Sequence, residues 1–342
     1  MLKYERACGL LRLRLAEGAY AARPFPAERD LATELGISYL TARKVVLHLI
    51  AEGRLVRSGR GRAVPAPAAD SGSRQVTLLT YGWPSQSLLR LERAFAATAA
   101  TLTVPTDRLH FRDWTDPLLA EVLARPGGTL LVPPAEDPTP GAAALLREAR
   151  SRVALLGMDG TPLGLPSVDH LPPGGVRLAL DHLLALGHRR LAIANVQPHC
   201  HTMRARLAEA QAWMRAHPRV AVTLHDAPVA SGEHSLPAAR QLARRILSAT
   251  TVPRALLGLT MPMAMGAQRA AADLGVDGLA VVAIDGQALA DDLVPAVTAV
   301  EIGDLEAVLA NTVSWLAGGT WNGAQRQLCP PHLVVRETSL PA

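Results

Sequence analysis

The sequence predicts an α/β protein in two parts: a small head of helices and a strand hairpin, then a large two-lobed domain with parallel sheets. Residues 1–65 carry three helical patterns and then two short strands around a glycine-rich turn. Residues 75–342 alternate short apolar runs with longer helical patterns, which is typical of parallel sheets covered by helices on both faces. Residues 66–74 contain Pro, Gly and Ser and are expected to link the two parts. A chain of 342 residues is also too long for one ordinary core.

Positive charge is concentrated in the head. Residues 1–75 hold 13 Lys and Arg against 7 Asp and Glu, a net charge of +6. The remaining chain holds 22 basic and 23 acidic residues, a net charge of −1. A basic module on a near-neutral body is typical of a polyanion-binding head attached to a domain with another task. We therefore expect the head to bind nucleic acid.

Composition and cysteine spacing argue against several other classes. Hydrophobic residues make up 49% and charged residues 19%, as in globular domains, and no uncharged apolar run is long enough to span a membrane. Charged residues interrupt the first 18 positions, so we expect no signal peptide, no membrane partner and a cytoplasmic location. Cys8, Cys200 and Cys329 are odd in number and widely spaced, so neither a disulfide framework nor a metal site is expected.

The head reads as a helix-turn-helix followed by a hairpin. Helical patterns occupy residues 2–18, 27–36 and 38–53, with a short turn between the second and the third. Ser38 is placed to cap the third helix. Residues 54–64 then read as strand, glycine-rich turn and strand, with several arginines that would face a phosphate backbone.

The order of these segments resembles the signature of the gluconate-repressor (GntR) family of winged helix-turn-helix proteins. The matching segments are LAEGAY (15–20), FPAERDLATELGIS (25–38), TARKVV (41–46), LIAEG (49–53) and SGRGRAV (58–64). The resemblance implies that the third helix enters a major groove. Ala27 and Tyr39 depart from the family's usual Ser and Arg, so the base preference is expected to differ. The residues implied to contact DNA are Arg29, Ser38, Tyr39, Thr41, Arg43, Lys44, Arg60, Gly61 and Arg62.

The large domain shows six apolar runs and seven helical patterns. The predicted strands are Val76–Leu79, Thr129–Val132, Val153–Leu156, Leu191–Ala194, Ala255–Leu259 and Leu279–Ile284. The predicted helices are Leu88–Ala100, Gly141–Ser151, Gly174–Leu186, Met203–Ala216, Leu236–Ser248, Met263–Leu274 and Asp304–Ala317. Their total length exceeds one doubly wound domain, which favours two lobes with a ligand-binding cleft between them.

The large domain resembles the sensing domains of the lactose/galactose-repressor (LacI/GalR) family. The most distinctive piece is Gly187-His188-Arg189-Arg190, within a longer match that begins at Val168. Shorter matches follow in the family order at 203–210, 264–275, 279–286, 295–300 and 333–339. The resemblance implies a periplasmic-binding-protein-like pair of α/β lobes joined by three crossings, with a small, sugar-like effector between them. A GntR-type head on a LacI-type body resembles the arabinose-repressor class of transcription regulators.

That class implies a repressor that acts as a homodimer on an inverted-repeat DNA operator, with no cofactor and no enzymatic activity. The residues expected to bind the effector are Tyr81, Trp83, Asp159, Arg206, Met261 and Asp285. Arg206 and Asp285 match family positions that hold sugar hydroxyls, and such a pair makes a directional polar clamp. Met261 stands where the family often has an aspartate, so the methionines at 261, 263 and 265 would either line a more apolar pocket or fill the core.

Two other functions stay open on the sequence. One is an architectural DNA-binding protein whose large domain has lost effector binding. The other is a small-molecule enzyme with an attached DNA-binding head. No GxSxG, Walker loop or dinucleotide fingerprint supports catalysis. An aminotransferase-like body would need a lysine for pyridoxal, and Lys3 and Lys44 both lie in the head.

Overall fold

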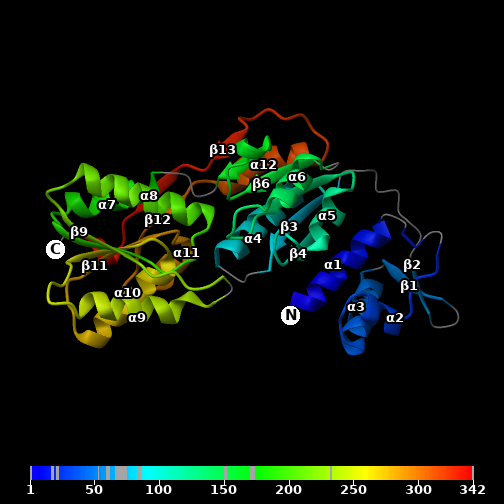
Figure 1. Ribbon diagram of the computed structural model, residues 1–342, viewed down its shortest axis with the longest axis horizontal. Coiled ribbons are helices and arrows are strands. Elements are labelled where there is room, and N and C mark those ends of the chain that lie inside the picture. The colour runs from blue at the N-terminus through cyan, green and yellow to red at the C-terminus, as the bar shows by residue number, and fades with distance from the viewer. Residues whose placement is uncertain are drawn as a thin grey trace.

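The structure is a computed structural model in which the head, a first lobe and a second lobe follow one another along the long axis (Figure 1). The residues that it describes are 2–16, 19–20, 23–52, 54–58, 62–65, 75–82, 86–149, 152–169, 174–231 and 233–340. None of the helices within these ranges combines the length and the apolar character needed to cross a bilayer.

The head contains three helices and a two-stranded antiparallel sheet in the predicted order. These elements are α1 (Leu2–Ala16), α2 (Glu28–Glu34), α3 (Tyr39–Ala51), β1 (Leu55–Arg57) and β2 (Ala63–Pro65). Ser38 begins α3, because its Oγ accepts a hydrogen bond from the backbone N–H of Thr41 at 3.2 Å. One apolar cluster that includes Leu11, Phe25 and Leu49 joins the three helices to β1. The turn between β1 and β2 lies outside the described residues.

The first lobe has a sheet of six parallel strands in the order β13-β7-β6-β5-β3-β4. Its strands are β3 (Val76–Tyr81), β4 (Thr106–Phe111), β5 (Gly128–Val132), β6 (Arg152–Leu156), β7 (Ser167–Asp169) and β13 (Arg326–Leu328). The helices that cover its two faces are α4 (Gln86–Thr101) with α12 (Leu305–Leu316), and α5 (Pro117–Leu123) with α6 (Pro140–Arg147).

The second lobe repeats this design with the strand order β14-β12-β11-β10-β8-β9, in which β14 alone is antiparallel to its neighbour. Its strands are β8 (Arg190–Asn195), β9 (Ala221–Asp226), β10 (Ala255–Gly258), β11 (Ala280–Ile284), β12 (Thr298–Ile302) and β14 (Pro331–Val334). Its helices are α7 (Gly175–Ala185) and α8 (His201–Ala216) on one face, α9 (Ser235–Leu247) and α10 (Met261–Leu274) on the other, and the short α11 (Gln287–Asp292).

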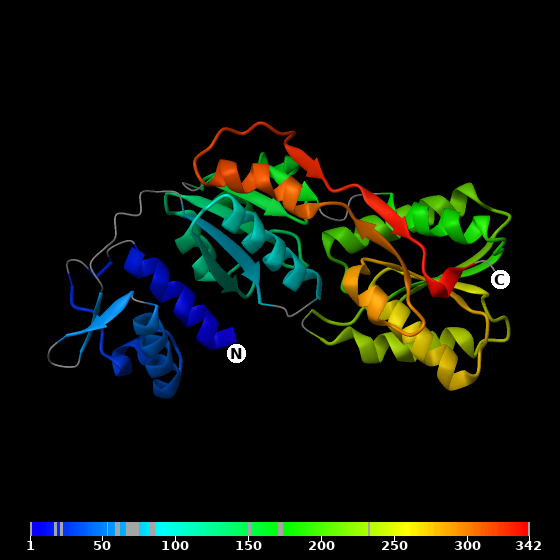
Figure 2. The same cartoon turned by 180° about the vertical axis from the view of Figure 1, so that it is seen from behind.

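The chain passes between the lobes three times. It crosses between β7 and α7, returns between β12 and α12, and crosses again between β13 and β14, as Figure 2 shows for the last two. Helix α12 therefore packs on the first lobe although it follows most of the second lobe in sequence. The two parallel sheets and the three crossings give the two-lobed α/β domain that the sequence predicted.

The six predicted strands are confirmed to within two residues, but six further strands were missed. Strand β4 alternates exposed and buried residues, and β9 has no buried residue, so neither carries a continuous apolar run. Strands β7 and β13 have only three residues each. The helix predicted over 141–151 ends at Arg147, so its last turn was wrong; Glu148 donates its backbone N–H to Ala144 as the cap.

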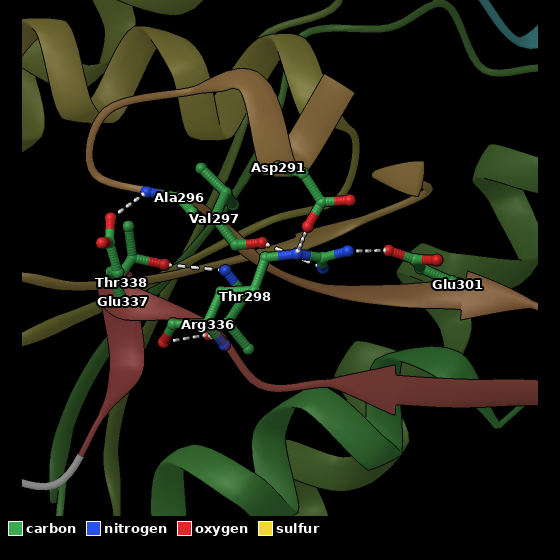
Figure 3. Close-up of polar contacts among 8 residues, drawn as sticks. All are labelled: Asp291, Ala296, Val297, Thr298, Glu301, Arg336, Glu337 and Thr338. Carbon is green, nitrogen blue, oxygen red and sulfur yellow. Dashed lines mark hydrogen bonds and ion pairs between the residues drawn. The ribbon is translucent and has the colours of Figure 1, made fainter. Parts of the chain in front are cut away.

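Arg336 fastens the segment after β14 to the second lobe (Figure 3). Its Nε donates to Asp291 of α11 at 2.5 Å and its Nη2 donates to Glu301 of β12 at 2.6 Å. Its backbone N–H also donates to the hydroxyl of Thr298 at 2.8 Å. The guanidinium lowers the pKa of Asp291 through its hydrogen bond. The side chain of Arg336 therefore connects the segment after β14 to α11 and β12.

Replacing Arg336 with Met is expected to lower the free energy of unfolding by about 1–3 kcal/mol, because Glu301 is left half-buried without its cation. Thermal unfolding followed by circular dichroism measures the change. Arg269→Met is the matched control, because Arg269 makes an exposed pair with Asp273 in the same lobe. Such a surface pair contributes less than about 1 kcal/mol. Equal effects of the two substitutions would contradict this role of Arg336.

Candidate functional site

The carboxyl ends of the parallel strands in both lobes carry polar side chains that meet between the lobes. Tyr81 ends β3 in the first lobe. Asp285 directly follows β11 in the second lobe, and Thr260 follows β10 as the residue before α10. An ion pair connects the lobes here, since Nη1 of Arg90 on α4 donates to Oδ1 of Asp285 at 2.6 Å. We refer to this contact region between the strand ends of the two lobes as the cleft; open α/β folds bind ligands at such strand ends.

Arg206 is a deeply buried cation of the cleft. It lies on α8 and is 7% exposed. Its Nη1 donates to the carbonyl of Leu259, at the end of β10, at 2.5 Å. Its Nη2 is buried and has no hydrogen-bond partner among the described residues. Burial lowers the pKa of this guanidinium, and the nearby carboxylate of Asp285 only partly opposes that shift.

Arg90 also has donors that the described part of the chain leaves without an acceptor. Its Nη1 is engaged with Asp285, but Nε and Nη2 are buried and unpaired. The hydroxyl of Thr260 is buried and unpaired in the same way. An unpaired buried donor costs about 1–3 kcal/mol, so the four such donors of Arg90, Arg206 and Thr260 need an explanation.

The rim of the cleft in the first lobe holds a separate ion cluster. Arg326 on β13 donates through Nη2 to Asp169 at 2.5 Å, and its Nη1 lies 3.3 Å from Asp159. Asp159 also accepts from the backbone N–H of Thr161 at 2.9 Å. The carboxylate of Asp159 is therefore already engaged in holding the strand ends of the first lobe.

Several contacts hold the two lobes together beside the Arg90–Asp285 pair. Arg204 on α8 pairs with Asp137, and the hydroxyl of Ser231 donates to Glu136 at 2.8 Å. Both carboxylates belong to the loop after β5 of the first lobe. A cavity of about 20 Å³, enough for one water, lies beside Arg206 near the crossings. Through these contacts the two lobes touch each other directly.

The residues predicted to bind the effector lie in different environments. The structure brings Arg206 and Asp285 close enough for the carboxylate to act on the guanidinium. Tyr81 is largely buried there, and burial raises the pKa of its hydroxyl to about 12, so it stays protonated at neutral pH. Met261 is 4% exposed and packs in the apolar core of the second lobe against Gly286, with Met263 in the same core. Trp83 lies outside the described residues.

The head presents one face of α3 to solvent. Tyr39 is 42% exposed and Leu40 is 68% exposed, and Arg43 and Lys44 are exposed beside them. The opposite face buries Val45, Val46 and Leu49 in the core of the head. The exposed face therefore combines two cations with two large apolar or aromatic side chains.

The other predicted DNA contacts surround this face or lie outside the described residues. Arg29 on α2 is exposed. The hydroxyls of Ser38 and Thr41 lie 2.8 Å apart at the start of α3, where they form its cap. Arg62 is exposed and its Nη2 donates to the carbonyl of Phe25 at 3.1 Å. Arg60 and Gly61 are not described.

The head packs against the first lobe, a contact that the sequence did not predict. Helix α1 lies along β4, the edge strand of the first sheet. Arg6 donates to the buried carboxylate of Asp116 at 2.7 Å. Gly9 permits the close approach, because a Cβ there would lie 2.3 Å from Cδ2 of Leu109 and 3.0 Å from the carbonyl of Arg108. A cavity of about 500 Å³ remains between α1, α3, α4 and β4.

We expect Gly9→Ala to weaken this docking while it strengthens α1 itself by about 1 kcal/mol of helix propensity. The added methyl group meets the fully buried Leu109, so the helix and the strand must separate. Hydrogen exchange read by mass spectrometry checks this, with faster exchange expected in β4 and unchanged exchange in α3. Thr33→Ala, on exposed α2, is the control. Unchanged exchange of β4 in Gly9→Ala would show that α1 does not protect that strand.

Within the residues that the structure describes, no group of three His, Cys, Asp or Glu side chains is placed to hold a metal. His199 and Cys200 precede α8, and His199 lies 2.8 Å from Asp226. The three cysteines are free thiols.

A family model described as a periplasmic binding protein-like domain matches residues 180–339. No curated protein matches the chain. Among solved structures, the chain resembles the lac repressor dimer bound to operator and the anti-inducer ONPF, with 22% identity and a TM-score of 0.64. That match covers 79% of this chain and 96% of that chain.

Two further structures show the same likeness. A LacI family transcriptional regulator from Mycobacterium smegmatis is 19% identical with a TM-score of 0.62, over 78% of this chain and 99% of that chain. The transcription regulator CcpA of Lactococcus lactis is 15% identical with a TM-score of 0.62, over 78% and 100% of the two chains. At these identities the likeness establishes the fold of the large domain: a two-lobed, periplasmic-binding-protein-like α/β domain.

Proposed function

We propose that this chain is a DNA-binding transcription regulator, a repressor, whose affinity for its operator is controlled by a small effector bound between the two lobes. The head acts as a GntR-type winged helix-turn-helix, with α3 in the major groove. Two copies of the chain form a homodimer that reads an inverted repeat. The large domain serves as a sensor and not as an enzyme.

The observation that carries the proposal is the exposed face of α3. Arg43 and Lys44 project from a helix whose opposite face is fixed in the core of the head, which is how a recognition helix presents itself to a groove. The excess of positive charge lies in the same part of the chain. A surface with two cations and Tyr39 can contact both phosphates and base edges.

The contact between α1 and β4 supports a route from the effector to the DNA. The head is fastened to the first lobe, and the cleft lies between the first lobe and the second. A change in the angle between the lobes would therefore change the position of the two heads relative to each other in a dimer. An effector that binds one angle more tightly than the other alters operator affinity by that difference in binding free energy.

Selection of DNA from a random library with the purified full chain tests the proposal. We expect an inverted repeat whose half-sites lie about 10 base pairs apart, or a multiple of that, because two recognition helices must meet the same side of the duplex. Fluorescence anisotropy at two salt concentrations then measures the affinity, which we expect to fall steeply with salt. Enrichment of no sequence, with binding that is only salt-dependent, would favour an architectural protein; no binding at all would overturn the proposal.

A further inference from the structure

We propose that the effector carries a single carboxylate group, which Arg90 and Arg206 bind together between the lobes. The inference rests on the proposed sensor function and adds the chemical class of the ligand. An aldonic or uronic acid, which is a sugar with one carboxylate, is the kind of molecule that fits.

Arg90 has one guanidinium edge whose donors lack an acceptor in the described part of the chain. Its Nη1 is held by Asp285, which fixes the orientation of the guanidinium plane. The Nε and Nη2 donors, both buried and without a partner in the described part of the chain, form one edge of that plane. Two parallel N–H groups on one guanidinium edge match the two oxygens of a carboxylate. A lone hydroxyl would satisfy only one of the two donors.

Arg206 supplies a third donor from the other lobe. Its Nη1 is anchored on the carbonyl of Leu259, and its buried Nη2 has no acceptor among the described residues. Asp285, which accepts from Nη1 of Arg90 at 2.6 Å, is also the largest attractive charge acting on this guanidinium, so the two arginines share one carboxylate neighbour. Two guanidinium groups from opposite lobes can hold one ligand only when the lobes are closed on it.

The net charge of the site favours a ligand that carries one negative charge. Arg90, Arg206 and Asp285 together carry +1 in a buried setting. Asp169 also acts on Arg206, but Arg326 donates to it at 2.5 Å and balances its charge. The second carboxylate paired with Arg326, that of Asp159, is partly exposed at the rim. A monoanion would neutralise the site of Arg90 and Arg206, whereas a phosphate dianion would leave it negative and a neutral sugar would leave it positive. Uncompensated buried charge is costly, so the monoanion is favoured.

Isothermal titration calorimetry of the full chain, without DNA, tests the inference. The ligands are gluconate, glucuronate and galacturonate, with glucose and galactose as the neutral parents and glucose 6-phosphate as the dianion. We expect at least one acid to bind about 10-fold or more tightly than its neutral parent, because only the acid pairs the buried donors. Binding by none of the acids at about 10 mM, equal binding of a neutral parent, or tighter binding of glucose 6-phosphate would each overturn the inference.

Matched substitutions locate the binding. Arg206→Met and Arg90→Gln should each weaken acid binding by about 10-fold or more. Arg215→Met, at an exposed position of α8, and Arg93→Gln, at an exposed position of α4, should leave it unchanged. Equal affinity in Arg206→Met and the wild type would overturn the inference.

The melting temperature of the ligand-free protein distinguishes an arginine that binds the ligand from one that only stabilises the fold. Replacing a buried, incompletely paired charge with an apolar side chain of similar length is often neutral or stabilising. We therefore expect ligand-free Arg206→Met to melt at the same temperature as the wild type or higher. A lower melting temperature together with retained acid binding would show that Arg206 holds the fold and not the ligand.

The substitution Asp285→Asn distinguishes a site for a sugar acid from a site for a neutral sugar. Asp285 has a left-handed backbone with φ of 69°, which asparagine adopts readily, so the substitution should not disturb the fold. The amide oxygen of asparagine can still accept from Nη1 of Arg90 and hold its guanidinium in place. Loss of the carboxylate then removes only a negative charge beside the ligand, so acid binding should strengthen by several-fold. Weaker acid binding would contradict the inference. These calorimetry experiments contain no DNA. Their outcome therefore tests the chemical class of the effector and not the proposed control of operator affinity.

Discussion

Replacing Arg43 with alanine is expected to lower operator affinity by about 1–3 kcal/mol, roughly 10- to 100-fold, without lowering the stability of the head. Arg43 lies on the exposed face of α3, opposite the residues that this helix buries in the core of the head. Lys44→Ala should act more weakly and should reduce the dependence on salt by about one phosphate contact. Fluorescence anisotropy with the selected operator measures both.

Arg219→Ala is the control for charge, because Arg219 is exposed in the second lobe, far along the chain from the head. It should leave the affinity unchanged. If Arg43→Ala and Arg219→Ala bind the operator equally well, α3 does not read DNA. A melting temperature equal to that of the wild type would rule out unfolding as the cause of a loss.

Gly128→Ala is expected to destabilise the first lobe by about 2–3 kcal/mol, which lowers the melting temperature by roughly 5–10 °C. Gly128 begins β5 beneath the end of α12. A Cβ at this position would lie 2.4 Å from the carbonyl oxygen of Leu316 and 2.7 Å from its carbonyl carbon. Both are backbone atoms, so the strand or the helix must shift.

Gly141→Ala is the control for this substitution. A Cβ at position 141, in the first turn of α6, meets nothing within 4 Å. It should be neutral or stabilise the helix by up to about 1 kcal/mol. Because α12 follows the second lobe in sequence, a selective loss at Gly128 would also support the return crossing after β12. Equal melting temperatures of the two variants would contradict the packing of α12 on β5.

The sequence predicts those elements of the fold that carry their own pattern. Central strands such as β5 and β10 are buried along their whole length and appear as continuous apolar runs. Edge strands do not, because one side faces solvent, and β4 gains part of its cover from α1. The docking of the head on the first lobe could not be predicted from the sequence either. A glycine at position 9 only lowers helix propensity in the sequence, and its role in close packing is visible only when Leu109 is placed next to it.

The candidate site was predicted in part. A family resemblance, carried by the order of the motifs, predicted Arg206 and Asp285, and the structure places both between the lobes. Arg90 was missed because it lies off the apolar stripe of α4, where a solvent-facing and a cleft-facing position look alike in sequence. Met261 was placed among the pocket residues, but it packs in the core of the second lobe, and no periodicity distinguishes those two environments. Only the meeting of the lobes brings Arg90 within 2.6 Å of Asp285.

Occupation of the cleft by the effector is expected to control how tightly the head binds DNA. The most direct test of this claim is the operator affinity of the full chain, measured by anisotropy with and without a saturating concentration of the tightest-binding acid. We expect the affinity of the wild type to change by about 5-fold or more, and that of Arg206→Met to stay constant. An operator affinity that stays the same in the wild type, while calorimetry shows the acid bound, would contradict the claim.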